Sequence, residues 1–214
     1  MDEEISIINE KTRNEKIKNF LSHNKRLLII ALLTIILSII GFFSYDVYKD
    51  REKKILSDKY NKALIEYDSD NKNQISFAMQ EIVKDKDNTY SPLALYFLID
   101  NNLIDNKKEA NRLFDILIYE TNLEIEIKNL IIYKKALFNS DSLNENELLE
   151  ILKPLFNSKS VWKSHGLYLA AEYFYSKNQK QKSKEFFNEI IRTENANQDI
   201  IKEAQKRLSR DLSE

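Results

Sequence analysis

The chain has 214 residues, of which 43% are hydrophobic, and a net charge of −1. Its two glycines, two prolines and absence of cysteine argue against a turn-rich sheet protein and exclude disulfides and thiolate metal sites. The near-neutral charge provides no basic surface for nucleic acid. The composition therefore predicts an all-α protein with one soluble domain and an appendage.

The first element in chain order is an apolar segment. Leu27 to Tyr45 contains no charged residue in nineteen positions and, as a helix, would span roughly 28 Å, close to the hydrocarbon thickness of a bilayer. A buried core helix and a cleaved signal peptide are the alternatives, but the segment is long and no small-residue cleavage site follows it. We expect an uncleaved single-pass membrane anchor. Its large apolar residues are Leu27, Leu28, Ile29, Ile30, Leu32, Leu33, Ile35, Ile36, Leu37, Ile39, Ile40, Phe42 and Phe43.

Lysine and arginine counts do not orient this anchor. Six of these residues lie within residues 1–26 and six lie within residues 46–64, so the positive-inside rule gives a tie. Lys25 and Arg26 adjoin the segment directly, whereas Asp46 follows it. This difference favours a cytoplasmic N-terminus.

The apolar spacing after the anchor is helical up to the C-terminus. Leu56, Tyr60, Ala63, Leu64 and Tyr67 share one helical face, and we expect this helix to continue directly from the anchor because no breaker separates them. Eight further faces bring the predicted soluble helices to nine, joined by short connections. These faces are Ile75–Val83, Leu93–Ile99, Ala110–Leu117, Ile127–Leu137, Leu148–Phe156, Leu167–Phe174, Phe186–Ile191 and Ile201–Leu208.

Capping signals mark several helix starts. The expected caps are Ser91 ahead of Pro92, Asn106, and the capping-box pairs Thr121–Glu124 and Ser142–Glu145. Pro154 falls inside an apolar run and is expected to kink or shorten its helix.

Residues 167–195 match the tetratricopeptide pattern of helical hairpins. Ala170 and Ala171 are small residues that let a second helix approach closely, a turn falls at Asn178, and Ser183 takes a small position on the second helix. A less regular copy runs over residues 90–121. Short connections permit a bundle or a solenoid, and the repetition favours a tetratricopeptide-like solenoid. The predicted parts are a tail (1–26), a transmembrane helix (27–45), a helical extension (46–70) and a repeat domain (71–214).

Several packing motifs accompany the anchor: Tyr90–Ala94, Ala110 with Phe114, Pro154-Leu155 ahead of Trp162, and the hairpin of Ala170, Ala171, Phe174, Phe186 and Phe187. In this combination the chain resembles the YfgM-like family of bacterial inner-membrane proteins from residue 20 onward. It departs from the pattern at Ser183, where alanine is usual, and in lacking turn glycines. The resemblance implies a cytoplasmic N-terminus, a periplasmic domain and an ancillary role at the SecYEG translocon, tethering periplasmic chaperones.

Catalytic constellations are absent from the sequence. His23 and His165 stand apart, and neither a glycine-rich phosphate loop nor a nucleophile elbow occurs. We expect no catalysis, no cofactor, no metal and no small-molecule substrate. Protein binding is the remaining route to function. The concave face of the best repeat would present Tyr168, Glu172 and Tyr175 to a partner, although tyrosines packed between hairpins would show the same spacing.

Three functions fit these features. The resemblance implies a scaffold at the inner membrane that links the Sec translocon with periplasmic chaperones. An anchored assembly chaperone for a specific unfolded client, as in cytochrome c maturation, is the first alternative. The second is a scaffold that faces the cytoplasm.

Overall fold

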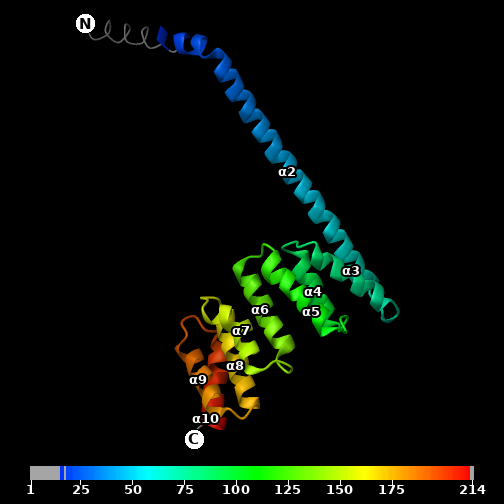
Figure 1. Cartoon of the computed structure of the whole chain (residues 1–214), viewed down its shortest axis with the longest axis vertical. Helices are drawn as coiled ribbons and strands as arrows, with labels where there is room; N and C mark the ends of the chain where they lie inside the picture. The colour runs from blue at the N-terminus through cyan, green and yellow to red at the C-terminus, as the bar shows by residue number, and fades with distance from the viewer. Residues whose placement is uncertain (1–14, 17, 213–214) are drawn as a thin grey trace, which may run out of the picture. The chain divides into compact units, whose positions relative to one another are not determined.

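A computed structural model of the whole chain describes residues 15, 16 and 18–212 (Figure 1). Every regular element in these residues is helical, and none is a strand, which confirms the all-α prediction. The chain divides into two compact units, residues 1–55 and residues 56–214. The predicted N-terminal tail lies mostly outside the described residues, with residues 18–23 forming a helical turn.

The longest element is α2, Lys25–Glu66, which runs for 42 residues without interruption. Its apolar part has a mean hydropathy of 2.8 and is not buried against other parts of the protein. The described residues thus contain one helix long and apolar enough to cross a membrane. Thr34 and Ser38 donate their hydroxyls to the carbonyls of Ile30 and Thr34, each at 2.9 Å, so these donors are satisfied without water. The prediction that the apolar segment continues directly into the following helix is confirmed.

The second unit is a succession of short helices after the end of α2. The elements are η1 (Ser69–Asn71), α3 (Lys72–Lys84), α4 (Tyr90–Asp100), α5 (Lys107–Asp115), η2 (Ile116–Glu120), α6 (Ile125–Asn139), α7 (Glu145–Phe156), α8 (Trp162–Ser176), α9 (Lys180–Arg192) and α10 (Gln198–Asp211). The first predicted apolar face lies on α2, except for Tyr67, which follows its last residue. Each later face lies in one of these helices or, for residues 110–117, across α5 and η2. Neighbours pack in sequence, as α3 with α4, α6 with α7, and α8 with α9. In addition, α6 packs on α8 and α8 packs on α10.

Two hydrophobic clusters hold this unit together. The larger begins at Ala63 near the end of α2 and reaches Phe174 on α8. The smaller joins α8, α9 and α10 through Leu167, Ala171, Phe187, Ile190, Ala204 and Leu212. Ala170 and Ala171 are fully buried, as expected of small residues that allow close helix approach. A Cβ at Gly166 would lie 3.1 Å from Leu155 Cδ1, so α7 and α8 are also close there.

Several predicted caps are wrong. Ser91 does not cap α4, which begins at Tyr90; instead, buried Ser91 Oγ donates to the carbonyl of Ile82 at 2.6 Å. Thr121 Oγ1 donates to the carbonyl of Ile116 at 3.0 Å, and the helix start at Glu124 has no side-chain cap. In each case a bond to the preceding helix competes with the predicted cap.

The second predicted capping box is displaced, and two other signals are confirmed. The box before α7 pairs Asn144 with Glu147, two residues beyond the predicted Ser142–Glu145. Asn106 caps α5 by accepting from the backbone N–H of Lys108 at 2.9 Å. Pro154 lies in the last turn of α7, which ends two residues later at Phe156, as expected of a residue that shortens its helix.

The buried face of α6 differs from the predicted one. Leu137, expected in the core, is 48% exposed, while Asn129 and Asn139 are buried. Asn139 exchanges two side-chain hydrogen bonds with Asn111 of α5, at 2.8 and 2.9 Å. This reciprocal pair satisfies the buried amide of Asn139 and sets which face of α6 turns inward.

Two buried serines predict opposite effects of substitution by alanine. Ser183 Oγ is buried without a hydrogen-bond partner, so Ser183→Ala should raise the free energy of unfolding by about 1 kcal/mol. Ser91 Oγ both donates to Ile82 and accepts from the N–H of Asp87 at 2.9 Å. Ser91→Ala should therefore lower it by about 1–3 kcal/mol. Urea unfolding of both variants measures the two changes in the free energy of unfolding. A lower value for Ser183→Ala would contradict the expected stabilisation.

Candidate functional site

The predicted partner-binding residues Tyr168, Glu172 and Tyr175 all lie half-buried on α8. Arg207 of α10 brings them together. Its guanidinium donates from Nε and Nη2 to the two carboxylate oxygens of Glu172, each at 2.7 Å, and its Cζ lies 4.3 Å from the centroid of the Tyr175 ring. The ring of Tyr168 packs edge-on against Phe187 of α9 at 5.6 Å.

The electrostatics of this cluster follow from its packing. Burial, together with the neighbouring carboxylate of Glu172, raises the pKa of Tyr168 to about 12. Arg207 also bonds Asp211, and the hydrogen bond from Arg210 is the main reason that the pKa of Asp211 falls to about 2. Glu172 and Tyr175 therefore hold α10 against α8, and Tyr168 packs against α9. Their role in binding a partner stays a prediction.

A second group of side chains, which the sequence analysis did not assign to a site, lies on α4, α6 and α8. Tyr133 of α6 stacks on Trp162 of α8 at 5.8 Å, and His165 contacts both rings at 5.7 and 4.9 Å. Lys134 Nζ lies 4.5 Å from the ring centroid of Tyr96 on α4. Burial raises the pKa of Tyr133 and, with a smaller contribution from Asp100, that of Tyr96. Apart from the local pair Trp162 and His165, these contacts join residues 29 or more positions apart, so no local pattern predicts them.

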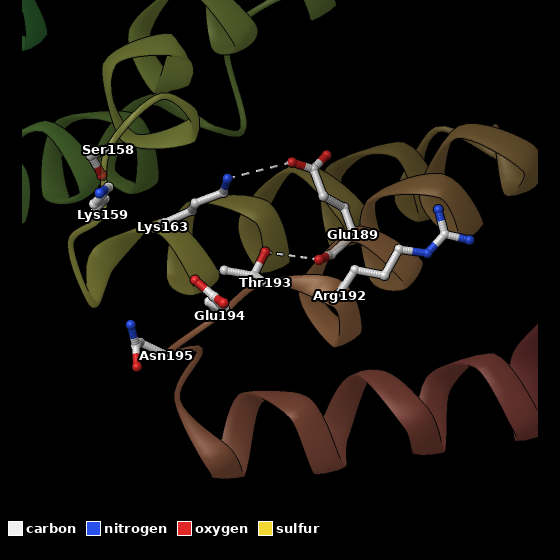
Figure 2. Close-up of a pocket in the computed structure, with 8 residues that line it drawn as sticks. All are labelled: Ser158, Lys159, Lys163, Glu189, Arg192, Thr193, Glu194 and Asn195. Carbon is white, nitrogen blue, oxygen red and sulfur yellow. Dashed lines mark hydrogen bonds and ion pairs between the residues drawn. The ribbon is translucent and has the colours of Figure 1, made fainter.

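A cavity of about 650 Å³ lies where the ends of α7 and α9 meet the start of α8 (Figure 2). Lys163 and Glu189 form an ion pair across it at 3.9 Å, and Thr193 donates to the carbonyl of Glu189 at 2.8 Å. Its lining is Ser158, Lys159, Lys163, Glu189, Arg192, Thr193, Glu194 and Asn195. The lining contains three cations and two carboxylates, so it shows no preference for an anionic or a cationic ligand.

Metal coordination has no candidate within residues 15, 16 and 18–212, where no three or more His, Cys, Asp or Glu side chains are grouped to hold an ion. No family model, no curated protein and no solved structure matches the chain. The resemblance to the YfgM-like family therefore stays a prediction that rests on the anchor and the packing motifs.

Proposed function

We propose that this chain is a membrane-anchored scaffold whose helical domain binds other proteins. The observation that carries the proposal is the unburied apolar part of α2, joined without a break to a unit built of helical hairpins. Apolar side chains such as Leu37, 68% exposed, and Phe42, 69% exposed, need an apolar surrounding that this chain does not supply. A bilayer supplies it along the whole segment.

A tetratricopeptide-like solenoid is the arrangement we propose for the helical unit. Support comes from α6 packing on α8 and α8 on α10, because first helices of successive repeats contact one another in such solenoids. The buried pair Ala170 and Ala171 suits the close approach of α9. The charged outer face of α10, with Lys202, Lys206 and Arg210 exposed, suits a capping helix at the end of a stack.

For the partners we propose the Sec translocon and periplasmic chaperones, with the N-terminus in the cytoplasm and the domain in the periplasm. The resemblance of the anchor and packing motifs supports these partners, and Lys25 and Arg26 beside the span support the orientation. The exposed Leu137 and the aromatic group of Tyr133, Trp162 and His165 on α6 and α8 offer apolar area to a partner.

The anchor is tested by placing charge in the middle of the span. An Ile36→Lys, Ile40→Lys double variant should move the chain from the carbonate-washed membrane fraction to the soluble fraction, because each central lysine costs about 3 kcal/mol in insertion. Ile65→Lys is the matched control, since Ile65 is 85% exposed at the end of α2 in the soluble unit. A double variant that stays in the membrane would contradict the anchor.

Orientation and partners are tested with reporters fused after Glu214 and with crosslinking from the domain. Activity of a periplasmic reporter, followed by crosslinks to translocon subunits, is the result we expect. A cytoplasmic reporter signal would instead support a scaffold that faces the cytoplasm and would remove the translocon and chaperone partners. Direct capture of one unfolded client by the purified chain would favour the assembly chaperone.

A further inference from the structure

Four of the five small residues within the span lie on one face of α2, and Ser44 lies off it. Ala31, Thr34, Ser38 and Gly41 follow one another at alternating steps of three and four, while the other faces carry leucine, isoleucine and phenylalanine. A Cβ added at Gly41 meets nothing within 4 Å. In lipid such a face lets a second helix approach closely. The small face alone does not show which helix would pack against it.

The same spacing continues where α2 has left the apolar segment. Tyr45, Tyr48, Glu52 and Ile55, which we call the stalk seam, extend the alternation of three and four. Tyr45, Tyr48 and Ile55 are 66%, 60% and 54% exposed. Charged residues fill most other positions from 46 to 54, so water surrounds this stretch. Apolar residues repeating in this way along a water-exposed helix are the pattern that a coiled-coil partner covers.

One face of α2 therefore runs from the lipid into water, and its side chains differ between the two surroundings. Inside the bilayer the residues of this face are small. Outside it they are large and, except for Glu52, apolar or aromatic. Both properties suit one continuous helix that runs alongside. From Leu56 onward the helix belongs to the second unit, whose core packs against Leu56 and Tyr60. The uncovered face therefore ends at Ile55.

We propose that the stalk seam and the small face of the span pair with the same surface of a second copy of this chain, in a parallel two-helix interface. Copies anchored in one membrane share one orientation, so a parallel pair brings each seam residue beside its own counterpart. The strict alternation of three and four over residues 31–55 winds such a pair into a left-handed coiled coil. The inference rests on the anchoring part of the proposed function.

Charge complementarity along the seam selects a second copy as the occupant. With Tyr45 and Glu52 at the a positions, Lys49 and Arg51 take the flanking e and g positions, which line the partner's a and d side chains. Each Glu52 carboxylate then lies beside Arg51 of the other copy, and the two Arg51 guanidinium groups offset the approach of the two Glu52 carboxylates. Tyr48 Oη already donates to Glu52 Oε1 at 2.9 Å, which holds the carboxylate along the seam.

Disulfide crosslinking of the full chain in proteoliposomes tests the pairing, because the chain has no cysteine of its own. Under mild oxidation, Tyr48→Cys and Ile55→Cys should give linked dimers at least about fivefold faster than Val47→Cys and Lys54→Cys, which lie on the opposite face. Val47 is 51% exposed, close to the 54% of Ile55, so exposure alone predicts no difference. Equal rates on both faces, or no dimer from any variant, would overturn the proposal.

A second substitution separates specific pairing from collision. Gly41→Leu combined with Tyr48→Cys should abolish the dimer, because the added side chain keeps the two helices apart. It meets no atom of its own chain near Cβ, so the anchor itself is unaffected. Ile40→Leu combined with Tyr48→Cys should crosslink like Tyr48→Cys alone. Dimers that survive Gly41→Leu would contradict the interface. Chains recovered in the membrane without dimers would refute the pairing only, whereas chains absent from the membrane would refute the anchor as well.

Discussion

Replacing Phe174 with alanine is expected to lower the free energy of unfolding of the helical unit by about 3–5 kcal/mol. The Phe174 side chain is fully buried on α8. Its ring stacks on Phe186 of α9 with centroids 5.4 Å apart and planes 8° apart, and Lys182 Nζ lies 5.2 Å from its centroid. The residue belongs to the larger hydrophobic cluster and contacts the hairpin partner of α8. Truncation therefore removes apolar contact and leaves a cavity between two helices.

Trp162 provides the measurement. It is the single tryptophan and stacks on Tyr133 in the second unit, so its fluorescence reports urea unfolding of that unit and not of the apolar part of α2. Phe77→Ala is the matched control, because Phe77 is 67% exposed on α3 and its loss should change stability by less than about 0.5 kcal/mol. A Phe174→Ala loss below about 1 kcal/mol would show that the α8–α9 hairpin repacks around the gap.

Helical periodicity made much of this fold predictable. Ala170, Ala171 and Phe174 recur at helical spacing, and each is fully buried in the structure. The long apolar helix was predictable for a simpler reason, since nineteen uncharged positions from Leu27 exceed what a domain of this size buries around a single helix. Both features depend on the spacing or the length of apolar residues, which can be read from a short stretch of sequence.

Helix starts were harder to predict because the chain is rich in residues that cap. Ser142 and Asn144 both precede a glutamate by three residues, and only the second forms the box. Ser91 has the side chain of a cap, but the carbonyl of Ile82 and the N–H of Asp87 take up its hydroxyl. Tertiary contacts decide between local alternatives that are nearly equal in energy.

The surroundings of the candidate site depend on partners distant in sequence. The Asn111–Asn139 pair turns Leu137 outward, although its spacing predicts a core position. The bonds between Arg207 and Glu172 join residues 35 positions apart. Periodicity predicts the helix that carries Glu172, but it does not predict which charged residue of α10 pairs with Glu172.

Removing the Arg207 side chain tests what holds α10 in place. Its side chain is 12% exposed and donates to Glu172 and Asp211 while lying against Tyr175. Arg207→Ala should lower the free energy of unfolding by about 2–3 kcal/mol, below the full loss for a buried pair because the Glu172 side chain is 35% exposed. Arg207→Lys keeps the charge but loses the two-pronged contact, so we expect an intermediate loss.

The part of the chain that is destabilised shows whether Arg207 stabilises α10 alone or the whole second unit. The smaller cluster joins α10 to α8 and α9 through only six buried residues, so in Arg207→Ala the amides of α10 should exchange with solvent faster than those of α4 and α6. Lys206→Ala is the control, because Lys206 is 56% exposed and pairs with Glu203 at 3.4 Å within its own helix. Uniformly faster exchange would mean that α10 unfolds together with the unit. Selective exchange in α10 would mean that the face bearing Tyr168, Glu172 and Tyr175 opens while the rest stays folded, and this opening is what a partner docking on that face would require.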